Sequence, residues 1–272
     1  MVQSSPSLND VWNCLRELRE RVPLVHNITN FVVMNTTANA LLALGASPVM
    51  AHEAEEMEEI TGIASALVLN IGTLSRLDIS AMHKALETAT LRDIPVVIDP
   101  VGAGASRLRT DTARALLENS RNALLRGNAS EIVSLAGQNG KTKGVDSTVS
   151  SETAVDAAKD LALRYGCTVS VSGEADLVTD GVRQCFIHGG SALMPRVTGM
   201  GCSASAIAGA FAGTCDKNYM LALIAAMSVM AAAGSDAAER STGPGTFLPV
   251  FFDNLYAMDL ALLEKGVSIS NA

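Results

Sequence analysis

Residues 195–209 read PRVTGMGCSASAIAG, and this stretch decides how the C-terminal part of the chain is arranged. Gly199 and Gly201 let the backbone turn tightly and come close to another molecule. The run 203–212 consists mostly of Ala, Gly and Ser, which predicts a helix with a thin wall that packs closely. A glycine turn that leads into a helix presents unpaired backbone N–H groups and the positive end of the helix dipole, which together favour an anion. Cys202 lies at the mouth of this candidate anion site, although an ordinary helix start with a small buried thiol explains the same residues.

The composition is that of a globular enzyme with a large core. The chain has 272 residues, of which 48% are hydrophobic and 18% are charged. No internal repeat, linker or change of composition divides it, so we expect residues 1–272 to form a single domain. The formal net charge of −8 argues against non-specific binding of nucleic acid. It leaves an anionic nucleotide open, because backbone amides and a metal ion also bind phosphate on an acidic protein.

The cysteines and the apolar segments indicate in which cellular compartment the protein is located. The five cysteines show neither CxxC pairs nor the spacing of a zinc site, which predicts reduced thiols and a cytoplasmic location. The first ten residues lack the basic region and the apolar core of a signal peptide. Residues 218–235 carry no charge, but they are rich in alanine and short for a membrane span. We therefore expect a buried helix there, and no membrane partner.

Short apolar runs alternate with helical patterns through the first two thirds of the chain. The expected strands are residues 23–26, 46–50, 66–71, 95–98, 123–125 and 167–171. The expected helices between them are residues 32–44, 53–61, 79–92, 111–120, 130–136 and 152–165. Apolar residues follow one another within most of these strands, as in strands that are covered on both faces. The order of elements predicts an α/β fold with three layers, α/β/α, around a mostly parallel sheet.

Beyond Gly173 the pattern changes to that of an antiparallel hairpin. Residues 176–179 and 183–187 flank Asp180-Gly181, which is a typical hairpin turn. Residues 194–197 then lead to the glycine turn. Three helices that begin near residues 202, 218 and 246 are expected to finish the chain.

Polar and glycine residues gather just after the expected strands, where open α/β sheets bind ligands. Five clusters have this position, at residues 26–30, 70–74, 99–104, 126–131 and 198–202. Each has a structural alternative: Asp99 would cap the next segment, and Asn128 would begin a helix with Glu131 as its capping-box partner. Together, a strand-end Asp, an Asn-x-x-Glu motif and a Gly-x-Gly turn supply carboxylates for a metal and amides for a phosphate. These are the groups that a Mg²⁺-dependent nucleotide phosphotransferase needs.

Two of these motifs resemble those of ribokinase-like kinases. Asn128-Ala129-Ser130-Glu131 matches their Asn-x-x-Glu motif, and Thr198-Gly199-Met200-Gly201-Cys202 resembles their Gly-x-Gly-Asp turn with Cys in place of Asp. Four longer stretches are similar to hydroxyethylthiazole kinases, in which a cysteine at the turn is typical. They are PLVHNITN at 23–30, LLALGASPVM at 41–50, DPVGAG at 99–104 and RGNASE at 126–131. The resemblance extends over about residues 10–260.

The resemblance implies a ribokinase-like fold without a lid domain. It also implies ATP-dependent phosphorylation of the hydroxyl group of 4-methyl-5-(2-hydroxyethyl)thiazole, with Mg²⁺ as cofactor, for thiamin salvage. The implied partners are the thiazole alcohol, ATP and two further copies of the chain, in a homotrimer with active sites between the subunits. Phe31, Val32 and Thr37 are then expected to reach a neighbouring copy.

The resemblance assigns the metal and the nucleotide to five residues. Asp99 and Glu131 are expected to organise Mg²⁺ and its water molecules, and Arg126 is expected to meet the ATP phosphates. Ser172 and Asn128 are expected to contact the nucleotide. The family usually has Thr at the position of Ser172, and Ser keeps the hydroxyl group.

The thiazole alcohol is placed by the resemblance against Asn30, Met50 and Gly199. For Met50, ordinary core packing at a strand end is the alternative. The implied catalytic residues are Gly199, Gly201 and Cys202, at the turn whose backbone amides would form the anion hole. The thiol of Cys202 stands where related kinases have a general base. We therefore expect positioning and charge stabilisation to matter more than a strong base.

Four other functions are open from the sequence. The first is another ribokinase-like kinase of small alcohols, and the second is a nucleotide-dependent hydrate repair enzyme of the same superfamily. The third is a nucleotide- or thiazole-binding sensor with weak catalysis. The fourth is a thiol nucleophile, because a helix N-terminus lowers the pKa of a cysteine such as Cys202. His26 follows a strand and is the candidate partner for that thiol, whereas His52 and His83 are expected at the surface.

Overall fold

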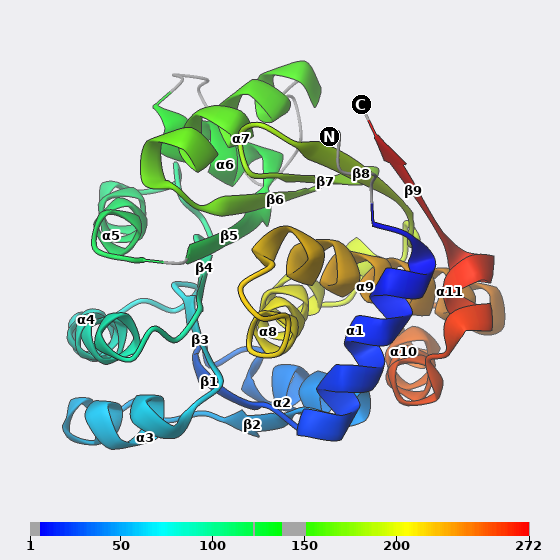
Figure 1. Ribbon diagram of the computed structural model, residues 1–272, viewed down its shortest axis with the longest axis horizontal. Coiled ribbons are helices and arrows are strands. Elements are labelled where there is room, and N and C mark those ends of the chain that lie inside the picture. Colours follow the sequence, from blue (N-terminus) through cyan, green and yellow to red (C-terminus); the bar gives the residue numbers. More distant parts are fainter. Residues whose placement is uncertain (1–5, 122, 138–150, 272) are drawn as a thin grey trace.

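A computed structural model describes residues 6–121, 123–137 and 151–271 of the chain. Within these ranges the strands form a nine-stranded sheet in the order β2-β1-β3-β4-β5-β6-β7-β8-β9 (Figure 1). The parallel strands are β1 (Leu24–Ile28), β2 (Ser47–Val49), β3 (Ala66–Asn70), β4 (Val96–Asp99), β5 (Ala123–Asn128) and β6 (Thr168–Ser172). The strands that continue the sheet in antiparallel pairing are β7 (Ala175–Thr179), β8 (Gln184–Gly189) and β9 (Val267–Asn271).

Two layers of helices cover the sheet, one on each face (Figure 1). One layer consists of α3 (Met57–Ile63), α4 (Arg76–Leu91), α5 (Arg107–Glu118), α6 (Ala129–Ala136) and α7 (Ser151–Tyr165). The other consists of α1 (Leu8–Arg21), α2 (Met34–Leu44), α8 (Met200–Ala212), α9 (Tyr219–Arg240), α10 (Pro244–Ala257) and α11 (Leu260–Gly266). The buried apolar side chains form two clusters, one under each layer. The predicted three-layer α/β/α fold is confirmed.

The parallel strands lie between the layers because their side chains are apolar on both faces. All five residues of β3 are buried, and so are all four residues of β4. Val68 of β3 aligns with Asn27 of β1 on one side and with Val97 of β4 on the other. This parallel register places the carboxyl ends of the strands at one edge of the sheet, where the polar clusters of the sequence follow.

Helix α9 is long and apolar enough to cross a membrane by length and composition. However, 89% of its most apolar window is buried inside the fold. A helix that is apolar all round and enclosed by other elements belongs to the core of a large domain. The buried helix expected at residues 218–235 is confirmed.

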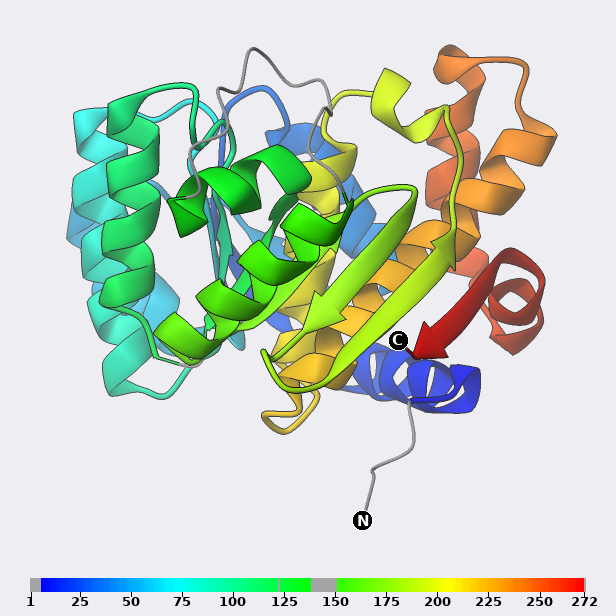
Figure 2. The same ribbon diagram turned by 90° about the horizontal axis from the view of Figure 1, so that it is seen from above.

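The ends of the chain contain elements that the sequence analysis missed. Helix α1 precedes the first strand, with a capping box between Ser7 and Asp10 and a buried stripe that includes Val11, Leu15 and Leu18. At the other end, α11 and β9 follow the three expected helices, and Figure 2 shows β9 in red beside β8. The expectation that three helices finish the chain is therefore wrong. A strand of five residues with two polar serines gives too weak a pattern to stand out from a loop.

The small residues of α8 let this helix lie close to the sheet, as the run 203–212 predicts. A Cβ atom at Gly209 would lie 2.7 Å from Cγ2 of Val68 and 3.3 Å from Cγ1 of Val25. Contacts this short leave no space for a side chain. Gly209 therefore sets the distance between α8 and the strands β1 and β3.

We expect Gly209→Val to lower the free energy of unfolding by about 1–3 kcal/mol, because the added side chain overpacks the contact with Val68. Gly245→Val in α10 is the matched control, since a Cβ atom there has no other atom within 4 Å. The control should change the stability by less than about 0.5 kcal/mol. Urea unfolding of both variants measures the difference. Equal stability of the two would show that α8 is free to move away from the sheet.

Candidate active site

Polar side chains from distant parts of the chain meet at the carboxyl ends of the parallel strands, beside the N-terminus of α8. Asn70 ends β3 and Asp99 ends β4, while Asn30 lies two residues after β1. Hydrogen bonds join these side chains to one another and to Cys202 of α8, which is 172 positions from Asn30 in the chain. The fold therefore brings these four predicted polar clusters into one place, and the fifth joins them through Arg126 and Glu131.

The N-terminus of α8 has the geometry of an anion site. Gly199 caps the helix with φ of +88°, a left-handed conformation that favours glycine. The N–H group of Ser203 donates to the carbonyl oxygen of Gly199 over 2.8 Å. The N–H groups of residues 200–202 precede this bond, and no side chain caps them. They are available to a negatively charged ligand, which the helix dipole also favours.

Arg126 of β5 lies directly against this helix end. A Cβ atom at Gly201 would lie 2.7 Å from Nη1 of Arg126, so a side chain there would displace the guanidinium group from this position. Nη2 donates to the hydroxyl of Ser172, the last residue of β6. Nε is buried and has no partner among the described residues. A buried donor without an acceptor is costly, so an anionic ligand at this place would satisfy it.

Asp99 is buried, with 2% of its surface exposed, at the end of β4. Its Oδ2 accepts from Nδ2 of Asn70 and from the hydroxyl of Ser205, both over 2.7 Å. Burial raises the pKa of Asp99 to about 7, although the nearby Arg126 acts in the opposite direction. The structural alternative for Asp99 is wrong, because the side chain that caps the next helix, α5, is that of Ser106.

Glu131 and Asn128 form the capping box that was the alternative to a catalytic role. The side chain of Asn128 accepts from the N–H group of Glu131 over 3.0 Å, and Oε2 of Glu131 accepts from the N–H group of Asn128 over 2.9 Å. Oε1 of Glu131 accepts from the N–H group of Gly102 over 2.9 Å, which ties the loop after β4 to α6. Glu131 is nevertheless close enough to raise the pKa of Asp99. Glu131 therefore helps to cap α6 and also lies within the candidate site.

The oxygen atoms around Asp99 fit a magnesium ion whose coordination is completed by water and substrate phosphates. Among the described residues, no group of three or more His, Cys, Asp and Glu side chains is arranged to hold a metal. Mg²⁺ is usually bound through one or two carboxylates together with water and substrate phosphates. Asp99 and Glu131 supply two carboxylates, and Oδ1 of Asp99 makes no hydrogen bond among the described residues. The residues present therefore fit the ion.

Asn70 and Ser205 belong to this cluster and were missed as site residues. Asn70 appears in the second polar cluster of the sequence, but it matches no motif. Its side chain joins Asn30 to Asp99, with Nδ2 of Asn30 2.9 Å from Oδ1 of Asn70. Ser205 lies one helical turn after Gly201, where its hydroxyl points at Asp99. The spacing from the glycine turn is the only signal in the sequence that could have indicated Ser205.

The thiol of Cys202 does not belong to a Cys–His pair. Burial raises the pKa of Cys202 to about 11, with a smaller contribution from Asp99, so the thiol is protonated at neutral pH. His26 uses both ring nitrogens elsewhere, with Nε2 3.1 Å from the carbonyl oxygen of Ala51 and Nδ1 2.9 Å from the hydroxyl of Thr61. Because a carbonyl oxygen only accepts, Nε2 donates and Nδ1 accepts. The alternative of a thiol nucleophile therefore lacks its general base.

The three residues predicted to contact the thiazole do not all contact the polar cluster. Met50 directly follows β2 and is half-buried, and no described contact joins it to the polar cluster. Gly199 approaches the start of α2, since a Cβ atom there would lie 3.1 Å from Cγ1 of Val33. Of the three predicted residues, Asn30 is the one that the structure connects to the other polar groups.

Two apolar side chains follow the cluster on the surface. Phe31 is 64% exposed and Val32 is 65% exposed, as a contact with a neighbouring copy requires. Thr37 of α2 is 1% exposed, so the expectation that it reaches a neighbouring copy is wrong. The ring of Phe31 stacks on that of His52, with 5.9 Å between the ring centroids. His52 was expected at the surface, but it is half-buried, with Nδ1 3.8 Å from Oδ1 of Asp78.

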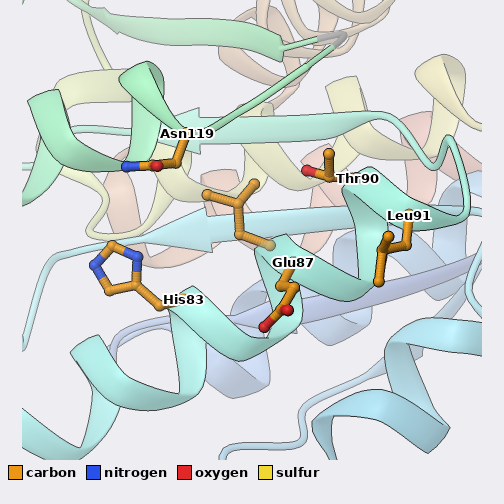
Figure 3. A pocket seen from close by; sticks show the side chains of 6 residues that line it. His83, Glu87, Thr90, Leu91 and Asn119 are labelled. Atoms are coloured by element: carbon orange, nitrogen blue, oxygen red, sulfur yellow. The ribbon is translucent and has the colours of Figure 1, made fainter.

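A surface groove of about 330 Å³ lies between α4 and α5 (Figure 3). It is lined by His83, Leu86, Glu87, Thr90, Leu91 and Asn119. None of the predicted site residues lines this groove. His83 was also expected at the surface and is half-buried like His52, and it lies in this groove, away from the polar cluster.

Comparison with known sequences points to one family. A sequence model of the hydroxyethylthiazole kinase family matches residues 15–260. A hydroxyethylthiazole kinase of Brachyspira hyodysenteriae is 53% identical over 251 residues, which are 92% of this chain and 94% of the relative. One of Nitratidesulfovibrio vulgaris (strain DP4) is 52% identical over 266 residues, or 98% of this chain and 99% of the relative.

Solved structures agree with the sequence comparison. The structure of a hydroxyethylthiazole kinase from Pyrococcus horikoshii OT3 has a TM-score of 0.89 and 40% identity, with 97% of this chain and 99% of that chain covered. A pyridoxal kinase from Staphylococcus aureus, in complex with AMP-PCP and pyridoxal, has a TM-score of 0.64 and 16% identity, with 92% and 100% covered. At that identity the second likeness shows the fold alone, which is the predicted ribokinase-like fold.

We expect the stability of a His26→Gln variant to depend less on pH than that of the parent protein. Burial lowers the pKa of His26 to about 4, below its value of about 6.5 in an unfolded chain. The unfolded state therefore binds the proton first as the pH falls. The stability that the neutral ring contributes, up to about 3 kcal/mol, is present above pH 6.5 and is lost between about pH 6.5 and 4. Urea unfolding of both proteins at pH 7 and pH 4.5 tests this, and an equal loss in both would contradict it.

Proposed function

The chain belongs to the hydroxyethylthiazole kinase family, and from this premise we propose that it transfers the terminal phosphoryl group of ATP to the hydroxyl of 4-methyl-5-(2-hydroxyethyl)thiazole. It is a phosphotransferase with an alcohol as acceptor, and thiamin salvage is the role that fits the family. The observation that supports the proposal most directly is the approach of Arg126 to the uncapped N-terminus of α8, with Asp99 beside them.

The transferred phosphoryl group is bound between Arg126 and the N–H groups of residues 200–202. Phosphoryl transfer proceeds through a loose transition state with charge on the phosphoryl oxygens, so positioning and charge stabilisation account for most of the catalysis. The Nη1 and Nε groups of Arg126 make no hydrogen bond among the described residues, which leaves them for phosphate oxygens. Ser172 orients the guanidinium group through its hydrogen bond with Nη2 and contacts the nucleotide together with Asn128.

Asp99 and Glu131 are the residues that we propose hold Mg²⁺, whose charge would neutralise the phosphates during transfer. The hydrogen bonds from Asn70 and Ser205 keep Oδ2 of Asp99 in place, and Oδ1 makes no hydrogen bond among the described residues. Both oxygens of Glu131 already accept from backbone N–H groups. This arrangement favours contact between Glu131 and the ion through water.

The thiol of Cys202 lies beside the alcohol in this proposal and does not remove its proton. With a pKa near 11, the thiol of Cys202 is almost entirely protonated at neutral pH. Only the thiolate could take the proton of the alcohol, so Cys202 contributes little as a base. Its sulfur accepts from Nδ2 of Asn30 over 3.4 Å, so the S–H group is free to donate. Met50, Gly199 and Asn30 contact the thiazole alcohol in this proposal.

The active enzyme is a cytoplasmic homotrimer with sites between subunits, formed from single-domain copies of residues 1–272. Support for the interface comes from the exposed apolar pair Phe31 and Val32, which directly follow Asn30 in the chain. Support for the compartment comes from the five cysteines, which are all free. A neighbouring copy over Phe31 and Val32 would exclude water from the alcohol without a lid.

The first test is release of ADP by the purified protein with and without the thiazole alcohol, for the parent protein, Asp99→Asn and Asp111→Asn. In Asp99→Asn the amide oxygen still accepts from Asn70 and Ser205, so the fold is kept while the charge is lost. We expect kcat to fall by about 100-fold or more. Asp111 is exposed on α5, and its variant should keep the parent rate.

Other outcomes of this assay separate the competing functions. Equal rates for Asp99→Asn and the parent protein would mean that the metal site is misplaced. Turnover with other alcohols and not with the thiazole would indicate a different ribokinase-like kinase. Binding of both ligands without ADP release would indicate a sensor.

The second test concerns Cys202. We expect Cys202→Ala to lose less than about 100-fold in kcat, because general-base catalysis is typically worth about 10²–10⁴-fold and a protonated thiol supplies little of it. The pH dependence of kcat should keep its shape in this variant. Cys185→Ala, a buried cysteine of β8, is the matched control. Complete loss of activity in Cys202→Ala, with both ligands still bound, would make the thiol an essential base or nucleophile.

A further inference from the structure

The side-chain amides of Asn30 and Asn70 form a chain of hydrogen bonds whose direction is fixed. The oxygen and nitrogen of an amide side chain are alike in shape, so their assignment has to follow from their partners. A backbone N–H group only donates, and that of Gly72 lies 3.0 Å from Oδ1 of Asn70. The atom of Asn30 that meets the same oxygen at 2.9 Å is therefore the donor, Nδ2. At the other end, Nδ2 of Asn70 donates to Asp99.

This direction leaves a single free acceptor on Asn30. One proton of Nδ2 goes to Asn70 and the other points to the sulfur of Cys202 at 3.4 Å. Oδ1 of Asn30 makes no hydrogen bond among the described residues. The residue is only 5% exposed, yet Oδ1 is not among the buried atoms that lack a partner. The small exposed part of the side chain therefore includes this oxygen, which belongs to the same amide as the nitrogen that meets Cys202.

The side chain of Asn30 is also held in place by shape. A Cβ atom at Gly72 would lie 2.6 Å from Nδ2 and 2.7 Å from Cγ of Asn30, so the amide lies directly on the backbone of Gly72. The same residue thus fixes both the position of the Asn30 amide and, through Asn70, its orientation. A preorganised acceptor beside an anion site is suited to a ligand with one donor group.

The thiazole alcohol has this donor pattern. Its ring nitrogen and sulfur only accept, and its hydroxyl is its sole hydrogen-bond donor. We propose that Oδ1 of Asn30 accepts a hydrogen bond from the hydroxyl group of the alcohol, and that Asn70 is the positioning residue that keeps Asn30 in this orientation. An alcohol that donates to Asn30 keeps its oxygen lone pairs free to attack the phosphoryl group at the N-terminus of α8. A flipped amide would instead donate to that oxygen and occupy one of the lone pairs.

The test compares binding of the thiazole alcohol with that of 5-ethyl-4-methylthiazole, which lacks only the hydroxyl group. Calorimetric titration gives the ratio of the two Kd values for the parent protein, Asn30→Ala and Asn70→Leu. A hydrogen bond of this kind makes the alcohol bind about three- to tenfold more tightly in the parent protein. We expect the ratio to fall to about 1 in both variants, although Asn70 does not touch the ligand. A purely structural role of Asn70 would weaken both ligands equally and leave the ratio unchanged.

Two further variants control for effects on folding. Asn27 is a buried asparagine on β1 whose amide bonds to the carbonyl oxygen of Val25, so Asn27→Leu should keep the parent ratio. Asn70→Asp keeps an oxygen for Gly72 and Asn30 and should retain the discrimination that Asn70→Leu loses. If Asn70→Leu does not fold by circular dichroism, Asn70→Ser takes its place with the same expected ratio of about 1.

The inference rests on the proposed function, and the outcomes separate the two. If the parent protein phosphorylates the alcohol but Asn30→Ala keeps the parent ratio, another group such as Asp99 accepts the hydroxyl, and the inference is wrong while the function stands. A ratio of 1 in the parent protein has the same meaning. If the parent protein does not phosphorylate the alcohol, both the function and the inference are wrong.

Discussion

The close approach of α8 to the sheet is the constraint on which the candidate site depends. Because Gly209 has no side chain, the helix packs directly on Val68 and Val25. This contact holds the first turns of α8 against the carboxyl ends of the strands, where the hydroxyl of Ser205 reaches Asp99 over 2.7 Å. A helix displaced by the width of a methyl group would lose that hydrogen bond. The small residues of α8 therefore set the distance between this helix and the sheet, and that distance determines both the packing of the core and the geometry of the site.

The second constraint is the burial of charge. Charged groups are expensive to bury unless hydrogen bonds replace the lost water. Asp99 has two side-chain donors and Glu131 has two backbone donors, so both carboxylates are held in place. Burial still outweighs the effect of Arg126 on Asp99, whose pKa is raised to about 7. The three groups carry one more negative than positive charge when ionised, which fits a site that a cation and a phosphate complete together.

The sequence predicted the parts of this arrangement that depend on local patterns. Apolar runs indicated β1 to β6, and strand-end motifs indicated Asp99, Glu131 and Arg126. It missed contacts that only the sheet creates: Asn70 and Asp99 are 29 positions apart and meet because β3 and β4 are paired in register. Arg109 was missed for the same reason, although its guanidinium group holds the loops after β3 and β4 through three carbonyl oxygens. Isolated polar residues have no period, so no pattern in a single sequence separates them from loop residues.

A neutral thiol at position 202 is consistent with the crowding of charge in this site. Cys202 accepts from Asn30, and Asp99 is close enough to raise the pKa of the thiol. A carboxylate in its place would add a third acidic group to Asp99 and Glu131, with Arg126 as the cation that opposes them. Like charges at short distance raise one another's pKa values, so the three groups would compete for a proton near neutral pH. A thiol avoids this competition, but it is a poorer base than a carboxylate. The loss matters little, because a loose phosphoryl-transfer transition state depends more on positioning and charge stabilisation than on a strong base. In the proposed function the charged groups are thereby left for phosphate and metal, and a neutral amide, that of Asn30, orients the alcohol.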